Sequence, residues 1–459
     1  MKKMDKIKIV LFFCLFIIIF GGTYAKINGS NYVTPESFGA KGDGKSDDSP
    51  AISKCLRSGK PIRFTSGKNY LLVSALQHSK SDELRIDGNG AKLTVSEKYD
   101  IKENGALFYF GMPRKKNLEV SDLEIDCLLG QKFSDKEKRG DTYIFSVESC
   151  EKVKFANVKF KSEKHYNNVT FLRDNGSRFL NIENCRIVIN TLSTQGGILW
   201  LMNQRDSICS VSIKNSYFEH DAKDECMCFS VYNKYDKKLC KMDVNVEKCE
   251  FYSKCESPSS GFILVYSHSQ KAYSTINVKY KACSFKTSGA SYSRKIQGYQ
   301  ICTGDSKYDY GIFNTEYEDC KFDFDFKTIK QSGIAGILYS KGTSMNPESI
   351  YYKFNKCEFK LRNTSPLIDD GNQYRKGTYE FNDCKFETDG KLFVKNKRSS
   401  DTDVRIKLTN CDIKSNDDVI STEYVIAKKC RFVNKSKNPI QLPNKRSKLE
   451  KCVVNGVKY

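Results

Sequence analysis

The chain has 459 residues, with 76 Lys or Arg against 55 Asp or Glu, and its formal net charge is +21 at pH 7. This length would ordinarily indicate about two or three domains, but a repeat protein can lengthen one stack without a larger globular core. The basic excess is compatible with a polyanionic partner, and equally with lysines that only solvate turns and strand edges. We find no Pro-rich or Gly/Ser-rich linker after the N-terminal segment, which favours one continuous domain.

The first 25 residues have the composition of a secretory signal peptide. Lys2, Lys3, Lys6 and Lys8 precede an apolar run over residues 9–20, and small residues follow at 21–25. The run is too short to span a bilayer comfortably. We therefore expect a signal peptide at 1–25 and a domain at 26–459 that is secreted, periplasmic or on the cell surface. Export disfavours nucleic acid as a partner, and we expect no integral membrane segment and a monomer.

A short phrase in which Cys is followed two positions later by an apolar residue recurs through the last two-thirds of the chain. Successive copies are 19 to 37 residues apart, and one copy has Ser in the Cys position. Repeats in this range indicate a solenoid. The repeating positions are Cys185, Ser216, Cys249, Cys283, Cys320, Cys357, Cys384, Cys411, Cys430 and Cys452.

A second strand-like segment, often preceded by Gly, lies between successive cysteine phrases, as at 196–203, 225–233 and 261–267. Strand, turn, strand and loop at this period predict the coils of a parallel β-helix, whose corners accept insertions of varied length. The longest insertions lie between Ser216 and Cys357, so a groove is expected there. Cysteines in one slot of a parallel stack point the same way, which suits free buried thiols better than disulfides.

Residues 38–48 read Phe-Gly-Ala-Lys-Gly-Asp-Gly-Lys-Ser-Asp-Asp, and are followed by Ala51-Ile52 and by a Pro-Ile-Arg-Phe run at 61–64. This region, over about 33–75, resembles the N-terminal signature of the pectate-lyase-like superfamily, which includes polygalacturonases, rhamnogalacturonases and phage tailspikes. The resemblance implies an all-β, right-handed, single-stranded parallel β-helix with an N-terminal capping helix. Asp47 or Asp48 would cap that helix over residues 49–56.

The densest polar group is the run from Glu219 to Glu225, which follows the Ser216 phrase. Asp224-Glu225-Cys226 resembles the Asp-Asp-Cys motif of polygalacturonases, and paired carboxylates suit glycoside hydrolysis. The resemblance implies catalytic roles for Asp224 and Glu225, with His220 beside them as a group that tunes or replaces the proton donor. Candidate substrate-binding residues are Lys223, Asp221, Trp200, Arg205 and Tyr232.

The rest of the polygalacturonase pattern is missing, because Ser193-Thr194-Gln195 and Ser259-Ser260-Gly261 stand where further motifs would lie. Elimination is therefore an alternative, with Lys223, Arg173 or Arg205 as the base and calcium as the only cofactor to consider. The charged run could also be a solvated turn, and Trp200 a core residue. We expect a protein that cleaves an acidic polysaccharide, with no metal in the hydrolase form. The alternative is a surface or carbohydrate-binding β-helix without catalysis.

Overall fold

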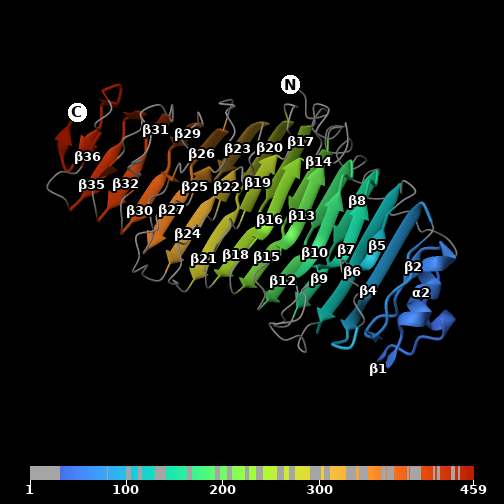
Figure 1. Cartoon of the computed structure of the whole chain (residues 1–459). Helices are drawn as coiled ribbons and strands as arrows, with labels where there is room; N and C mark the ends of the chain where they lie inside the picture. Colours follow the sequence, from blue (N-terminus) through green and yellow to red (C-terminus); the bar gives the residue numbers. More distant parts are fainter. Residues whose placement is uncertain are drawn as a thin grey trace, which may run out of the picture.

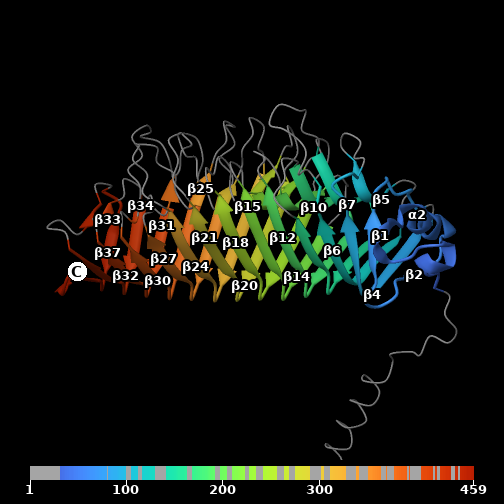
Figure 2. The same ribbon diagram turned by 90° about the horizontal axis from the view of Figure 1, so that it is seen from below.

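The computed structural model is one elongated stack of parallel strands with a helix at its N-terminal end (Figures 1 and 2). None of its described helices is both long and apolar enough to cross a membrane. The all-β parallel β-helix with an N-terminal capping helix, expected from the sequence, is confirmed. The structure describes residues 32–79, 81–99, 105–111, 116–129, 141–162, 168–191, 197–203, 209–222, 227–233, 241–255, 263–267, 274–289, 301–303, 311–326, 338–340, 350–362, 368–369, 377–389, 392, 405–416, 419–420, 424–435, 440–442 and 445–459.

The coils contribute strands to three parallel ladders, and among the described residues the third ladder ends before the last coils of the other two. We call them the first, second and third ladder in chain order, counting from the strand before the cysteine phrase. In the first ladder the strands are β8 (Lys152–Ala156), β11 (Phe179–Glu183), β14 (Cys209–Lys214), β17 (Lys241–Glu247), β20 (Ser274–Lys281), β23 (Gly311–Glu318), β26 (Ile350–Asn355), β29 (Gly377–Asn382), β31 (Arg405–Thr409), β34 (Tyr424–Lys428) and β37 (Lys448–Glu450).

The second ladder begins just after the cysteine position of each coil. Its strands are β9 (Lys159–Ser162), β12 (Arg186–Thr191), β15 (Tyr217–Ala222), β18 (Glu250–Cys255), β21 (Ser284–Gly289), β24 (Lys321–Phe326), β27 (Glu358–Arg362), β30 (Lys385–Thr388), β32 (Asp412–Ser415), β35 (Arg431–Asn434) and β38 (Val453–Val454). Near the N-terminus, the long strands β4 (Glu83–Val95) and β6 (Asn117–Cys127) continue from the first ladder into the second.

The third ladder is a separate nine-stranded sheet. Its strands are β5 (Ala106–Phe110), β7 (Asp141–Glu148), β10 (Asn168–Asn175), β13 (Gly197–Asn203), β16 (Met227–Asn233), β19 (Ile263–Ser267), β22 (Ile301–Thr303), β25 (Leu338–Ser340) and β28 (Ile368–Asp369). Three short pieces complete the C-terminal end: β33 (Val419–Ile420) pairs with β36 (Ile440–Gln441), and β39 (Val457–Lys458) folds back antiparallel on β38.

The cysteine phrase spans two strands rather than one, because a left-handed residue turns the chain immediately before each cysteine position. This corner residue has a φ of 49° to 55° in every coil from β4 onward, a region that L-residues other than Asn and Asp rarely adopt. The corner residues are Asn89, Asp122, Asn157, Asn184, Asn215, Lys248, Ala282, Asp319, Lys356, Asp383, Asn410, Lys429 and Lys451.

The repeated cysteines form a buried row of free thiols along the inside of these corners, as predicted. From Cys185 to Cys452, each thiol donates to the carbonyl oxygen two residues earlier, with Sγ···O distances of 3.3 to 3.5 Å. Ser216 keeps the same geometry, since its Oγ donates to Lys214 O at 2.7 Å. Thiol and hydroxyl therefore satisfy the same backbone acceptor in successive coils.

Two columns of aromatic rings flank the corners and fill the core. Rings at the start of the second ladder stack at 4.6 to 5.2 Å between centroids, in the order Phe218, Phe251, Phe285, Phe322, Phe359 and Phe386. Rings at the end of the first ladder stack at 4.7 to 4.8 Å, in the order Tyr280, Tyr317, Phe354 and Phe381. The two columns meet edge to face, an arrangement that aromatic quadrupoles favour.

The N-terminal end is closed by η1 (Pro35–Phe38), β1 (Asp43–Asp47), α2 (Ser49–Ser58), β2 (Ile62–Arg63) and β3 (Asn69–Leu72). Ile52, Cys55 and Leu56 of α2 are buried. Asp48 occupies the N-cap position of α2, but its carboxylate accepts from Lys41 N and Gly42 N at 2.7 and 3.2 Å and not from the helix. The carboxylate that accepts from the first turn of α2 is that of Asp47, whose Oδ1 accepts from Ser49 N at 3.0 Å.

Candidate functional site

The residues nominated from the sequence are distributed over two ladders. On β15, Asp221 is half-buried and points outward, whereas His220 is 0% exposed and points into the coil. Trp200 lies on β13 in the third ladder and is half-buried. Period-two alternation along β15 puts neighbouring residues on opposite faces, so His220 does not share the surface of Asp221.

The remaining nominated residues lie beyond what the structure describes. This holds for Lys223, Asp224, Glu225 and Arg205, and for the side chain of Tyr232, whose backbone belongs to β16. The catalytic and substrate-binding roles assigned to them stay predictions.

The structure assembles a cluster of aromatic and charged side chains around Glu219 that sequence reasoning missed. Tyr217 donates its hydroxyl to Glu219 Oε2 at 2.6 Å, and Lys254 Nζ lies 3.0 Å from Glu219 Oε1. The guanidinium of Arg186 lies 4.0 Å from the Tyr217 ring centroid, and Lys254 Nζ lies 5.0 Å from that of Tyr252. These side chains come from β12, β15 and β18, three successive strands of the second ladder.

These contacts keep Glu219 ionised. Its side chain is only 14% exposed. Burial acts to raise the pKa of Glu219, but the hydrogen bonds from Tyr217 and Lys254 outweigh it, and the pKa falls below its ordinary value of 4.5. Burial, together with the bond to Glu219, raises the pKa of Tyr217 to about 12. At neutral pH the carboxylate is therefore a hydrogen-bond acceptor and not a proton donor.

A depression of about 440 Å³ runs from this cluster along the outer face of the second ladder. Tyr217 and Tyr252 line one end, and Arg362 lines the other. Arg362 is held by two carboxylates of β24, with its Nη2 2.6 Å from Asp323 Oδ1 and its Nε 3.4 Å from Asp325 Oδ2. Apart from Arg362, its lining residues lie between Ser216 and Cys357, where the insertion lengths predicted a groove.

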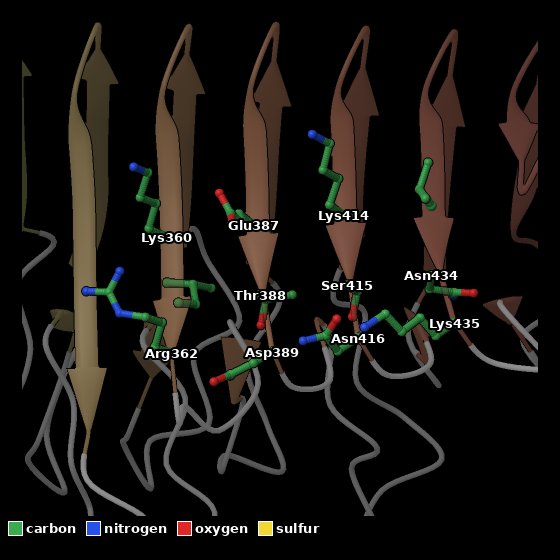
Figure 3. Close-up of a pocket in the computed structure, with 12 residues that line it drawn as sticks. Lys360, Arg362, Glu387, Thr388, Asp389, Lys414, Ser415, Asn416, Asn434 and Lys435 are labelled. Carbon is green, nitrogen blue, oxygen red and sulfur yellow. The ribbon is translucent and has the colours of Figure 1, made fainter.

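A second depression of about 410 Å³ continues past Arg362 toward the C-terminus. Figure 3 shows its side chains in two rows across successive strands. Lys360, Glu387 and Lys414 occupy matching register positions in one row. The other row contains Arg362, Asp389, Asn416 and Lys435.

Because both depressions include Arg362, we treat them together as the second-ladder groove, which extends from Tyr217 to Lys435. Four lysines line it, Lys286, Lys360, Lys414 and Lys435, and none of them forms an ion pair with another residue that the structure describes. Within the described residues, no group of three or more His, Cys, Asp or Glu side chains is arranged to hold a metal ion. The groove can therefore offer tyrosine rings, carboxylate acceptors and free ammonium groups to an extended ligand.

The comparisons with known proteins give only structural likenesses. No family model and no curated protein matches the chain. Tailspike protein 3 of bacteriophage CBA120 is 11% identical, with a TM-score of 0.44 over 96% of this chain and 68% of that one. PfbA, a surface adhesin of Streptococcus pneumoniae, is 12% identical, with a TM-score of 0.34 over 93% of each chain.

The catalytic unit of a GH87 α-1,3-glucanase from Streptomyces thermodiastaticus is 8% identical, with a TM-score of 0.36 over 94% of this chain and 69% of that one. Likenesses this distant say nothing about activity. None of these three proteins is described as a member of the pectate-lyase-like superfamily, so that narrower assignment stays a prediction.

Proposed function

We propose that this protein is exported and binds an acidic polysaccharide along the second-ladder groove. The observation that carries the proposal is the groove itself, which follows the long axis of the solenoid over successive coils. Its tyrosines offer rigid amphipathic rings to sugar faces, and its four lysines offer charge to anionic groups.

Binding is tested by calorimetry on a panel of acidic and neutral polysaccharides with the double variant Lys360→Ala/Lys414→Ala. Two lost contacts of about 0.5–1 kcal/mol each predict affinity for the acidic ligand reduced on the order of tenfold. The matched control is Lys281→Ala/Lys428→Ala, which removes the same charge from exposed positions of the first ladder. An equal loss of affinity in both double variants would show that only the net charge matters, and it would refute the groove as the binding site.

Cleavage of the bound chain is the second candidate. Asp221 points outward at the end of β15, and the chain then enters the segment with Asp224 and Glu225. If this segment reaches the groove, paired carboxylates would stand beside the bound sugar. The test is release of reducing ends and ultraviolet absorbance by wild type, by Asp224→Asn and by the first-ladder control Asp243→Asn.

New reducing ends without absorbance identify hydrolysis, and absorbance from an unsaturated product identifies elimination. Either activity should disappear in Asp224→Asn and persist in Asp243→Asn. Binding without any product across the panel would mean that the protein binds carbohydrate and does not cleave it.

A further inference from the structure

The third ladder has a separate cluster of aromatic side chains around one guanidinium group near its N-terminal end. Tyr109, Tyr143, Arg173 and Trp200 come from β5, β7, β10 and β13, four neighbouring strands. Tyr109, Arg173 and Trp200 are half-buried, whereas Tyr143 is 4% exposed and forms the floor.

Strand register places the guanidinium between the rings. Tyr109, Ser146, Arg173 and Trp200 occupy matching positions on successive strands, about 4.8 Å apart. Arg173 Cζ lies 5.0 Å from the centroid of the Tyr143 ring, and that ring lies 6.2 Å from Trp200 at an angle of 47°. Arg173 and Trp200 are therefore neighbours above one aromatic floor.

Glu148 of β7 influences Tyr109 in this cluster. Burial, and after it the charge of Glu148, raises the pKa of the Tyr109 hydroxyl. Arg173 forms no ion pair with any residue that the structure describes, and its guanidinium lies over the face of the Tyr143 ring. A guanidinium stacked on a ring keeps its N–H groups at the edge, where they can form two parallel hydrogen bonds with a carboxylate.

We propose that Arg173 and Trp200 form a second carbohydrate subsite, specific for a sugar residue that bears a carboxylate. Arg173 binds the carboxylate, and the half-buried indole ring of Trp200 packs against the sugar. The subsite lies on the third ladder and does not depend on ligand binding in the second-ladder groove.

Trp200 is the only tryptophan of the chain, so its fluorescence reports on this subsite alone. The experiment titrates the full-length protein with a hexuronic acid trisaccharide, its neutral hexose counterpart and acetate, all at matched ionic strength. We expect a saturable change in Trp200 emission with the acidic trisaccharide and none with the neutral one or with acetate.

Arg173→Ala should weaken this response tenfold or more, and Arg173→Lys should restore part of it, because a point charge replaces the bidentate fork. Circular dichroism establishes that each variant keeps its β-structure. Lys360→Ala/Lys414→Ala should leave the response within twofold of wild type, so failure of the groove and failure of this subsite are distinguishable.

Three results would overturn the proposal. A response of equal strength to the neutral trisaccharide would show that Arg173 does not recognise the carboxylate of the ligand. An equal response to acetate would show that binding needs only a carboxylate and no sugar ring. If Trp200 emission stays unchanged while calorimetry detects binding of the acidic polysaccharide, all binding takes place elsewhere on the protein.

Discussion

The corner residue is the position where a single side chain has most influence on the shape of the coil. Asn and Asp tolerate the left-handed conformation because their short polar side chains form local hydrogen bonds. Several corner residues also donate to the corner residue of the preceding coil, such as Asn157 Nδ2 to Asp122 Oδ1 at 2.8 Å. Ala282 has neither advantage, although its φ of 52° is the same.

We therefore expect Ala282→Asn to raise the apparent free energy of unfolding by about 1 kcal/mol, the usual cost of the left-handed region for an ordinary residue. Chemical denaturation followed by circular dichroism measures the change. Ala156→Asn is the control, because Ala156 lies in a strand and not at a corner. A gain of the same size in both variants would mean that the corner conformation is not its cause.

Glu219 provides a prediction about pH. Its folded-state pKa is lowered, so its stabilising effect is full above the ordinary value of 4.5 and is lost as pH falls through the folded-state value. Glu219→Gln should lower the free energy of unfolding by about 1 kcal/mol at neutral pH, because hydrogen bonds to a charged group are replaced by weaker ones. The difference between the two proteins should shrink below pH 4.5, as measured by denaturation across a pH series. A constant difference would contradict ionisation of Glu219 as its source.

At the scale of strands and ring columns, stability rests on stacking within the core. Phe322 is 1% exposed and packs between Phe285 and Phe359, with centroids 5.0 and 4.6 Å away. It also meets Tyr317 and Phe354 of the neighbouring column. A gap here would therefore interrupt one column and remove support from the other.

Phe322→Ala should lower the free energy of unfolding by about 3–5 kcal/mol, as for other buried aromatic residues. Phe322→Leu should cost clearly less, because it leaves a smaller cavity. Both are measured by denaturant unfolding. Equal losses would show that ring stacking and cavity volume are not the controlling quantities.

The thiol row should be chemically silent in the folded protein. Reaction requires access to the sulfur, and every cysteine of the row is buried, with at most 2% of the residue exposed. Alkylation followed by peptide mapping should leave the row from Cys185 to Cys452 unmodified until denaturant is added. Disulfides between row positions, or alkylation in the native state, would contradict a row of buried free thiols.

The same elements show which features of the fold the sequence pattern predicted. The cysteine phrase predicted the solenoid and the free thiols because one slot repeats with one side-chain direction. It predicted at least two strands per coil and did not locate the corner between the first and second ladders, since Lys248, Ala282 and Lys356 there have none of the usual signals of a left-handed turn.

For the candidate site, the Asp224 motif drew attention to the coil that also carries Tyr217 and Glu219. Period-two alternation from the buried Ser216 could have predicted that these two side chains share the outer face. The pairing of Arg362 with Asp323, 39 residues earlier, could not be predicted. It depends on the length of the intervening loop, which the repeat does not constrain.

Over the whole molecule, the groove crosses eight strands of the second ladder, from β15 to β35, which at about 4.8 Å per step spans about 34 Å. A polymer bound along it should gain contacts with each added sugar until this span is filled. We expect affinity for a series of acidic oligosaccharides to rise with length and to level off near that span, as measured by calorimetry. An affinity that is already maximal for a disaccharide would indicate a local pocket in place of a groove.

The repeated corner has a consequence for how such a molecule changes its size. Every coil passes through the same backbone conformation at the same place, so two corners are equivalent points at which the chain can be joined. Excision of residues 357–383 would connect Lys356 directly to Cys384 and restore the corner sequence Lys-Cys found at Lys429 and Lys451. The rod would shorten by one coil of about 4.8 Å. Duplication of the same segment would lengthen it equally, so recombination between repeats can produce related rods of graded length without inventing a new turn.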